Sequence, residues 1–125
     1  MSRVAIVTGG TRGIGAAISE TLKNSGYNVA ATYYGNDGAA KEFSDTTGVP
    51  HFKFDVGDFK STQEGVAKIE AALGPIEILV NNAGITRDAF LHKMKLEQWK
   101  EVIHTNLDSV FNVTRCVIEG MRERG

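Results

Sequence analysis

The stretch Thr8-Gly9-Gly10-Thr11-Arg12-Gly13-Ile14-Gly15 separates two segments of different hydrophobic periodicity. Before it, residues 3–8 are β-branched and apolar, which predicts a strand buried on both faces. After it, residues 13–24 show helical spacing and Gly26 supplies a stop signal. The apolar face expected for this helix consists of Ile14, Ala17, Ile18, Thr21 and Leu22. Glycines at such a junction let the main chain approach a pyrophosphate, and the helix N-terminus forms an anion site. A tight turn without a ligand is the alternative.

The rest of the chain continues the alternation of strands and helices. Further strands are expected at 28–33, 50–55 and 76–80, and further helices at 38–46, 60–73 and 96–124, the last with a bend near Asn106. This order indicates βαβ units and a parallel sheet with strand order 3-2-1-4. The sequence therefore predicts an α/β fold, a Rossmann-type doubly wound parallel sheet, with residues 1–125 in one domain.

Composition and charge narrow the function classes. With 14 basic and 15 acidic residues the net charge is -1, which argues against a nucleic-acid partner. Cys116 is the single cysteine, so no internal disulfide is expected, and no metal site is indicated. The apolar runs are too short for a signal peptide or a membrane span, so a cytoplasmic location without a membrane partner is expected.

The charge pattern after the second strand favours NADPH as the cofactor. NAD-specific sites place an acid there to bind the ribose hydroxyls, and that acid would repel a 2'-phosphate. Here Tyr33-Tyr34-Gly35-Asn36 occupies the region, and Asp37 comes late for this role. Arg12, helped by the hydroxyl of Thr11, is expected to pair with the phosphate. An arginine that is simply solvated on a loop is the alternative.

Two motifs together resemble the short-chain dehydrogenase/reductase family. The first is the Gly-x-x-x-Gly-x-Gly spacing from Gly9, and the second is Asn81-Asn82-Ala83-Gly84 after the fourth strand. Two asparagines that merely cap a turn are the alternative for the second motif. The resemblance implies cofactor contacts from Gly9, Thr11, Arg12, Gly13, Ile14, Gly15, Tyr33, Asn82, Ala83, Gly84, Ile85 and Thr86.

The resemblance also gives roles to residues after the third strand and in the last helix. Asp55 and Val56 correspond to the carboxylate and main-chain group that hold the adenine ring, although Asp55 as a cap of the following helix is an equal alternative. Asn106 matches the helical asparagine that bends the helix and holds a water relaying protons to the catalytic lysine. An asparagine without such a role is mildly unfavourable inside a helix.

Within the family, the runs 81–88, 92–94, 98–99 and 111–114 are most similar to bacterial 3-oxoacyl thioester reductases. This similarity implies that the complete enzyme reduces acetoacetyl-CoA with NADPH, or else an acyl-carrier-protein thioester. Asp88 corresponds to an aspartate beside the substrate entrance, and an exposed loop carboxylate is its alternative. A homo-oligomer, a tetramer in the complete enzyme, is also implied.

The chain departs from the family pattern in its catalytic residues. The family uses a serine, then a tyrosine with a lysine four residues later, whereas Tyr27, Tyr33 and Tyr34 are followed at that spacing by Ala31, Asp37 and Gly38. Without a proton donor, hydride transfer would leave an alkoxide. The chain is therefore expected to be the amino-terminal half of such an enzyme and inactive alone. A non-catalytic half-domain that binds nucleotide is the alternative.

Overall fold

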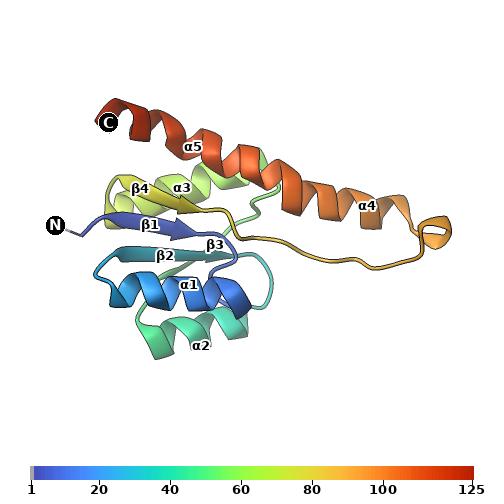
Figure 1. Cartoon of the computed structure of the whole chain (residues 1–125), viewed down its shortest axis with the longest axis horizontal. Coiled ribbons are helices and arrows are strands. Elements are labelled where there is room, and N and C mark those ends of the chain that lie inside the picture. Colours follow the sequence, from blue (N-terminus) through green and yellow to red (C-terminus); the bar gives the residue numbers. More distant parts are fainter. Residues whose placement is uncertain (1) are drawn as a thin grey trace.

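The computed structural model describes residues 2–125, whose four strands form one parallel sheet in the order β3-β2-β1-β4 (Figure 1). The predicted α/β fold and strand order are thus confirmed. The elements are β1 (Val4–Val7), α1 (Gly13–Asn24), β2 (Asn28–Tyr33), α2 (Asp37–Thr47), β3 (His51–Lys53), α3 (Phe59–Leu73), β4 (Ile76–Val80), η1 (Leu91–Lys93), α4 (Leu96–Ile103), η2 (His104–Asp108) and α5 (Ser109–Arg124).

The central strand β1 sets the register of the sheet. It pairs with β2 from Val4↔Asn28 to Val7↔Ala31, and with β4 up to Val7↔Val80. Because all strands are parallel, their carboxyl ends lie at one edge of the sheet. The loops that carry the candidate site residues leave from this edge.

The two faces of the sheet are covered by different helices. Ala5, Val7 and Val29 pack on one face with residues of α1 and α2. On the other face Val4 and Ile6 pack with Val66 and Ile69 of α3 and with Val113 and Val117 of α5. Ile6 and Val7 have no exposed surface, which explains why this strand reads as a continuous apolar run.

The buried face of α1 agrees with the expected one in part: Ile18 and Leu22 pack against the core of the sheet as expected, whereas Ile14, Ala17 and Thr21 do not. Gly15 and Ser19 are its buried residues, whereas Ile14 is 76% exposed and Ala17 is also exposed. The reason is close packing: the Ser19 hydroxyl donates to the Gly10 carbonyl at 3.0 Å, and Gly15 lies against the turn. Small residues thus let α1 approach the glycine-rich turn, and the larger Ile14 is left outside.

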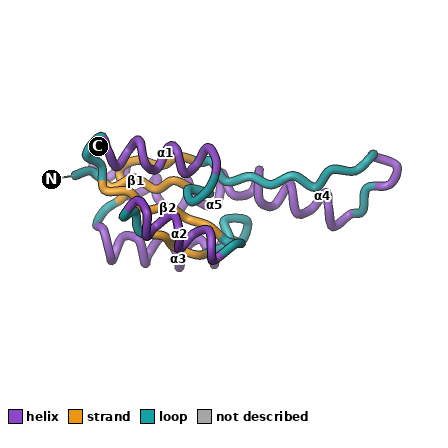
Figure 2. The backbone as a smooth tube through the Cα atoms, turned by 90° about the horizontal axis from the view of Figure 1, so that it is seen from below, coloured by secondary structure: helices purple, strands orange, loops and turns teal. Residues whose placement is uncertain are grey.

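The last helical region is interrupted at the expected place. Residues 104–108, which include Asn106, form a π-helix between α4 and α5. Val113 and Val117 of α5 face the sheet, while Val110, Phe111 and Ile118 are exposed. Figure 2 shows α4 and the loop before it extending beyond the layered part of the molecule. Among residues 2–125, none of the helices combines the length and the apolar character that a membrane span needs.

One prediction concerns the contact of α3 with the sheet. A methyl group at Gly65 would overlap the ring of Phe54, which is 5% exposed. We expect Gly65→Ala to lower the free energy of unfolding by about 1–3 kcal/mol, because overpacking outweighs the better helix propensity of alanine. Urea unfolding of the intact protein measures this change.

Gly38→Ala is the matched control for that prediction. Gly38 lies in the exposed first turn of α2, where an added methyl would meet only the Asn36 side chain at 3.9 Å. This variant should be as stable as the parent or more stable, by up to about 1 kcal/mol. Equal effects of the two substitutions would contradict the packing explanation.

Candidate functional site

The glycine-rich turn between β1 and α1 depends on glycine at four positions for two reasons. Gly9 and Gly13 have φ values of +63° and +54°, a region that side chains disfavour. A methyl group at Gly10 would lie 2.7 Å from the Val7 carbonyl oxygen, and one at Gly15 would overlap the Gly9 carbonyl. Both the backbone conformation of the turn and its close contact with α1 therefore require glycine at these four positions.

The segment after β4 is tied to this turn by hydrogen bonds. The Thr8 hydroxyl accepts from the backbone N–H groups of Asn82 and Ala83, both at 3.0 Å. The Asn82 amide donates to the carbonyls of Thr8 at 3.1 Å and Gly9 at 3.2 Å. Asn82, Ala83 and Gly9 are therefore brought together, and the Asn82 side chain is directed into the protein rather than towards solvent. Their predicted contacts with a cofactor stay predictions.

The first turn of α1 fits a phosphate group. Arg12 is the residue before α1, and its side chain does not cap the helix. The backbone N–H groups of the first turn of α1 therefore stay available to an anion. A methyl group at Gly13 would meet no atom within 4 Å, which leaves the approach open. Arg12 and Ile14 are exposed beside this space, whereas Thr11 is 8% exposed. The predicted help of the Thr11 hydroxyl in binding the 2'-phosphate stays a prediction.

The Asp55–Val56 segment is held from two sides. The Asp55 carboxylate accepts from the Gly57 N–H at 2.9 Å, and the Val56 carbonyl accepts from the Asn112 amide at 3.0 Å. Asp58, not Asp55, caps α3 through the Ser61 N–H at 2.9 Å. The capping alternative for Asp55 is therefore wrong. Asn112 is 6% exposed and was given no role of its own from the sequence, although it lies in the run 111–114 and is a polar residue among the apolar positions of a helix.

Asn106 uses both ends of its amide on one residue. Its Oδ1 accepts from the Ile85 N–H at 2.8 Å, and its Nδ2 donates to the Ile85 carbonyl at 2.9 Å. This clamp joins η2 to the loop that follows Gly84. Each end of the amide makes one bond here, which leaves one N–H of Nδ2 and one lone pair of Oδ1, so the predicted contact with a water molecule stays a prediction. A π-helix interrupts the regular hydrogen-bond ladder, so main-chain carbonyl groups are the available acceptors here.

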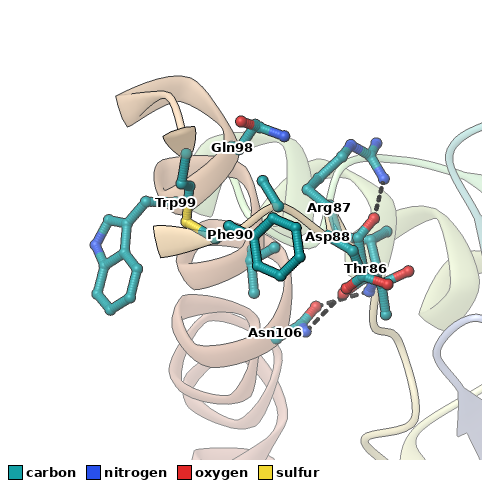
Figure 3. Close-up of a pocket in the computed structure, with 11 residues that line it drawn as sticks. Thr86, Arg87, Asp88, Phe90, Gln98, Trp99 and Asn106 are labelled. Carbon is teal, nitrogen blue, oxygen red and sulfur yellow. Dashed lines mark hydrogen bonds between the residues drawn. The ribbon is translucent and has the colours of Figure 1, made fainter. Parts of the chain in front are cut away.

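A pocket of about 740 Å³ lies between this loop and α4 (Figure 3). Asp88 is exposed on its loop side, and an ion pair of 2.8 Å between Arg87 and Glu101 joins the loop to α4. Figure 3 shows Asn106 on the helix with its amide directed to the loop. The lining residues are Ile85, Thr86, Arg87, Asp88, Ala89, Phe90, Met94, Gln98, Trp99, Val102 and Asn106. The structure therefore brings Asp88, Thr86 and Asn106 to one pocket.

Tyr33 ends β2 at the same edge of the sheet. Partial burial raises the pKa of its phenol, as does the neighbouring carboxylate of Asp37, while Lys53 opposes the increase. Asp37 is the first residue of α2 and forms an ion pair with Lys53 at 3.1 Å. Within residues 2–125 no group of three or more histidine, cysteine, aspartate or glutamate side chains could hold a metal ion.

Comparison with known proteins gives close relatives. A family model described as short chain dehydrogenase matches residues 3–125. The acetoacetyl-CoA reductase of Rhizobium meliloti (strain 1021) is 60% identical over 125 residues, which cover 100% of this chain and 52% of that protein. The acetoacetyl-CoA reductase of Paracoccus denitrificans is 57% identical, with 99% and 51% covered.

More distant similarities agree with these. The 3-oxoacyl-(acyl-carrier-protein) reductase FabG of Escherichia coli (strain K12) is 43% identical over 98% of this chain and 50% of its own length. The solved structure of a candidate short-chain dehydrogenase from Novosphingobium aromaticivorans has a TM-score of 0.90 and 26% identity, covering 98% of this chain and 46% of that one. The chain spans about half the length of the curated relatives it matches. Since one family model accounts for almost all of the sequence, the chain belongs to the short-chain dehydrogenase family.

Proposed function

We propose that the protein carrying this chain reduces a 3-oxoacyl thioester with NADPH, and that its substrate is acetoacetyl-CoA, which becomes 3-hydroxybutyryl-CoA. The observation that carries this proposal is the 60% identity, over the whole chain, to a protein named acetoacetyl-CoA reductase. Residues 1–125 would form its NADP-binding half. A cytoplasmic location and a homotetramer belong to the same proposal, by family resemblance.

The cofactor proposal rests on the edge of the sheet that carries the glycine-rich turn. The N–H groups at the start of α1 and the open space at Gly13 suit the pyrophosphate. The exposed Arg12 suits a 2'-phosphate, and Tyr33 ends β2 where an NAD-specific protein would place an acid. The remaining contacts are proposed for Gly9, Thr11, Ile14, Gly15, Asp55, Val56, Asn82, Ala83, Gly84, Ile85 and Thr86.

The residues of this chain would bind and orient the cofactor and the substrate, while the cofactor supplies the reducing power. NADPH, when bound, supplies a hydride. The carbonyl oxygen also needs a proton, and we propose that its donor lies outside residues 1–125, because no tyrosine here has a lysine four residues later. Asn106 would serve the proton relay by holding a water molecule, while its amide also anchors the loop at Ile85. Asp88 would lie on the substrate side of the pocket.

Two other functions remain alternatives. The 43% identity to the acyl-carrier-protein reductase FabG supports a carrier-bound substrate, and a non-catalytic protein that only binds nucleotide is the third reading. Oxidation of NADPH by the intact protein, measured with acetoacetyl-CoA and with acetoacetyl-acyl carrier protein in parallel, distinguishes all three. Turnover of the CoA thioester with the higher kcat/KM supports the proposal, and binding of NADPH without turnover of either substrate supports the third reading.

Arg12→Ala should weaken the binding of NADPH much more than that of NADH. Loss of a charge-assisted contact with the 2'-phosphate corresponds to about 1.5 kcal/mol, or roughly tenfold in Kd. Fluorescence titration of the intact protein with each cofactor measures the two constants. Arg3→Ala is the matched control, because Arg3 pairs with Glu77 at the opposite end of the sheet. Equal losses for NADPH and NADH would show that Arg12 does not read the phosphate.

Asn106→Ala should reduce kcat at least about tenfold while changing the Kd of NADPH by less than about threefold. The substitution removes both bonds to Ile85 and leaves the glycine-rich turn untouched. Asn112→Ala provides the contrast, because it releases the Val56 carbonyl and should affect NADPH binding and stability first. If Asn106→Ala lowered only the melting temperature, with kcat unchanged, its proposed part in the proton relay would be wrong.

A further inference from the structure

The first acid after β2 is Asp37, and its carboxylate is already engaged. The Lys53 ammonium lies 3.1 Å from its Oδ1 and 3.4 Å from its Oδ2. The phenol of Tyr33 is also close to Asp37: after partial burial, the negative charge of Asp37 is the next cause that raises the pKa of Tyr33. We name Tyr33, Asp37 and Lys53 the acid latch.

The topology of the sheet explains why these three groups meet. Tyr33 and Lys53 are register partners on the adjacent strands β2 and β3, so their side chains leave the same face of the sheet. Asp37 begins α2, which covers that face. Asn36 has the left-handed φ of +57° and caps α2 by accepting from the Ala39 N–H at 3.0 Å, which fixes where the helix starts. The position of Asp37 is therefore set by the backbone.

The acid latch borders the glycine-rich turn. The Gly10 N–H donates to the Thr32 carbonyl at 3.0 Å, so the turn that carries Arg12 is bonded to the last residues of β2. A dinucleotide bound at this turn would place its adenosine ribose near the end of β2. A free carboxylate at Asp37 would then attract ribose hydroxyls and repel a phosphate.

We propose that Lys53 determines the selectivity between NADPH and NADH: by holding Asp37 against β3, it keeps the carboxylate away from the ribose. This inference rests on the cofactor choice in the proposed function and adds a residue that acts through another residue. Lys53 is a positioning residue, not a contact for the phosphate. The Asp37 and Lys53 side chains are 68% and 50% exposed, and exposed ion pairs contribute little to folding stability. Removing the pair should therefore change the folding stability little, so that its effect on cofactor binding can be measured separately.

Lys53→Met in the intact protein is the first test. It keeps the length of the side chain and releases Asp37, so the ratio of NADPH affinity to NADH affinity should fall about fivefold, the effect of one charge in partly screened surroundings. The Kd of each cofactor is measured by fluorescence titration, so no turnover is required. Lys41→Met is the matched control, since Lys41 pairs with Asp45 at 2.9 Å further along α2.

A double substitution identifies the mechanism. With Asp37→Asn present there is no carboxylate to release, so adding Lys53→Met should change the affinity ratio by no more than Lys41→Met does. A full fivefold loss in the Asp37→Asn background would show that Lys53 contacts the phosphate directly and would overturn the latch. Equal effects of Lys53→Met and Lys41→Met in the parent would overturn it as well.

Cofactor binding by the unsubstituted protein distinguishes a failure of this inference from a failure of the proposed function. A parent that binds NADH as tightly as NADPH would overturn the cofactor choice, and the latch with it. A parent that prefers NADPH and is unaffected by Lys53→Met would overturn the latch alone. A fall in the ratio that disappears in the Asp37→Asn background is the result that supports it.

Discussion

The hydrogen bonds of Thr8 with the segment after β4 are the constraint on which the site depends. One hydroxyl accepts from two backbone N–H groups, and the Asn82 amide returns two bonds to the end of β1. These bonds hold the ends of two neighbouring parallel strands together, so the glycine-rich turn has no freedom to move away. The same geometry explains why position 15 is a glycine, because a side chain there would overlap both the Gly9 carbonyl and the Asn82 amide.

Amide side chains, rather than charges, fix the loops around the site. Asn82, Asn106 and Asn112 each bond to main-chain groups of a different loop. An amide carries a donor and an acceptor without a net charge, so it can hold backbone in place without raising or lowering the potential that an anionic cofactor meets. Charged groups add to these contacts at one place, where the pair of Arg87 and Glu101 joins the loop to α4.

The strand order and most element positions could be predicted, because hydrophobic periodicity and glycines are local signals. The buried face of α1 could be predicted in part. Ile18 and Leu22 follow the apolar periodicity, whereas Gly15 and Ser19 are buried because they are small and because Ser19 bonds to Gly10, which periodicity does not detect. Asn112 was missed for a related reason: its partner, the Val56 carbonyl, is 56 residues away in sequence. Asn106 was found through family resemblance, but its two bonds to Ile85 required the structure.

The π-helix at 104–108 changes the phase between α4 and α5. A residue in an α-helix advances by about 100° around the axis, and the wider π turn absorbs one residue more than an α turn does. With this offset in place, Val113 and Val117 of α5 pack against the core on the sheet, and Asn106 bonds to Ile85 in the loop after Gly84. Residues 104–108 therefore work as a rotational spacer, and the length of the segment matters as much as its composition.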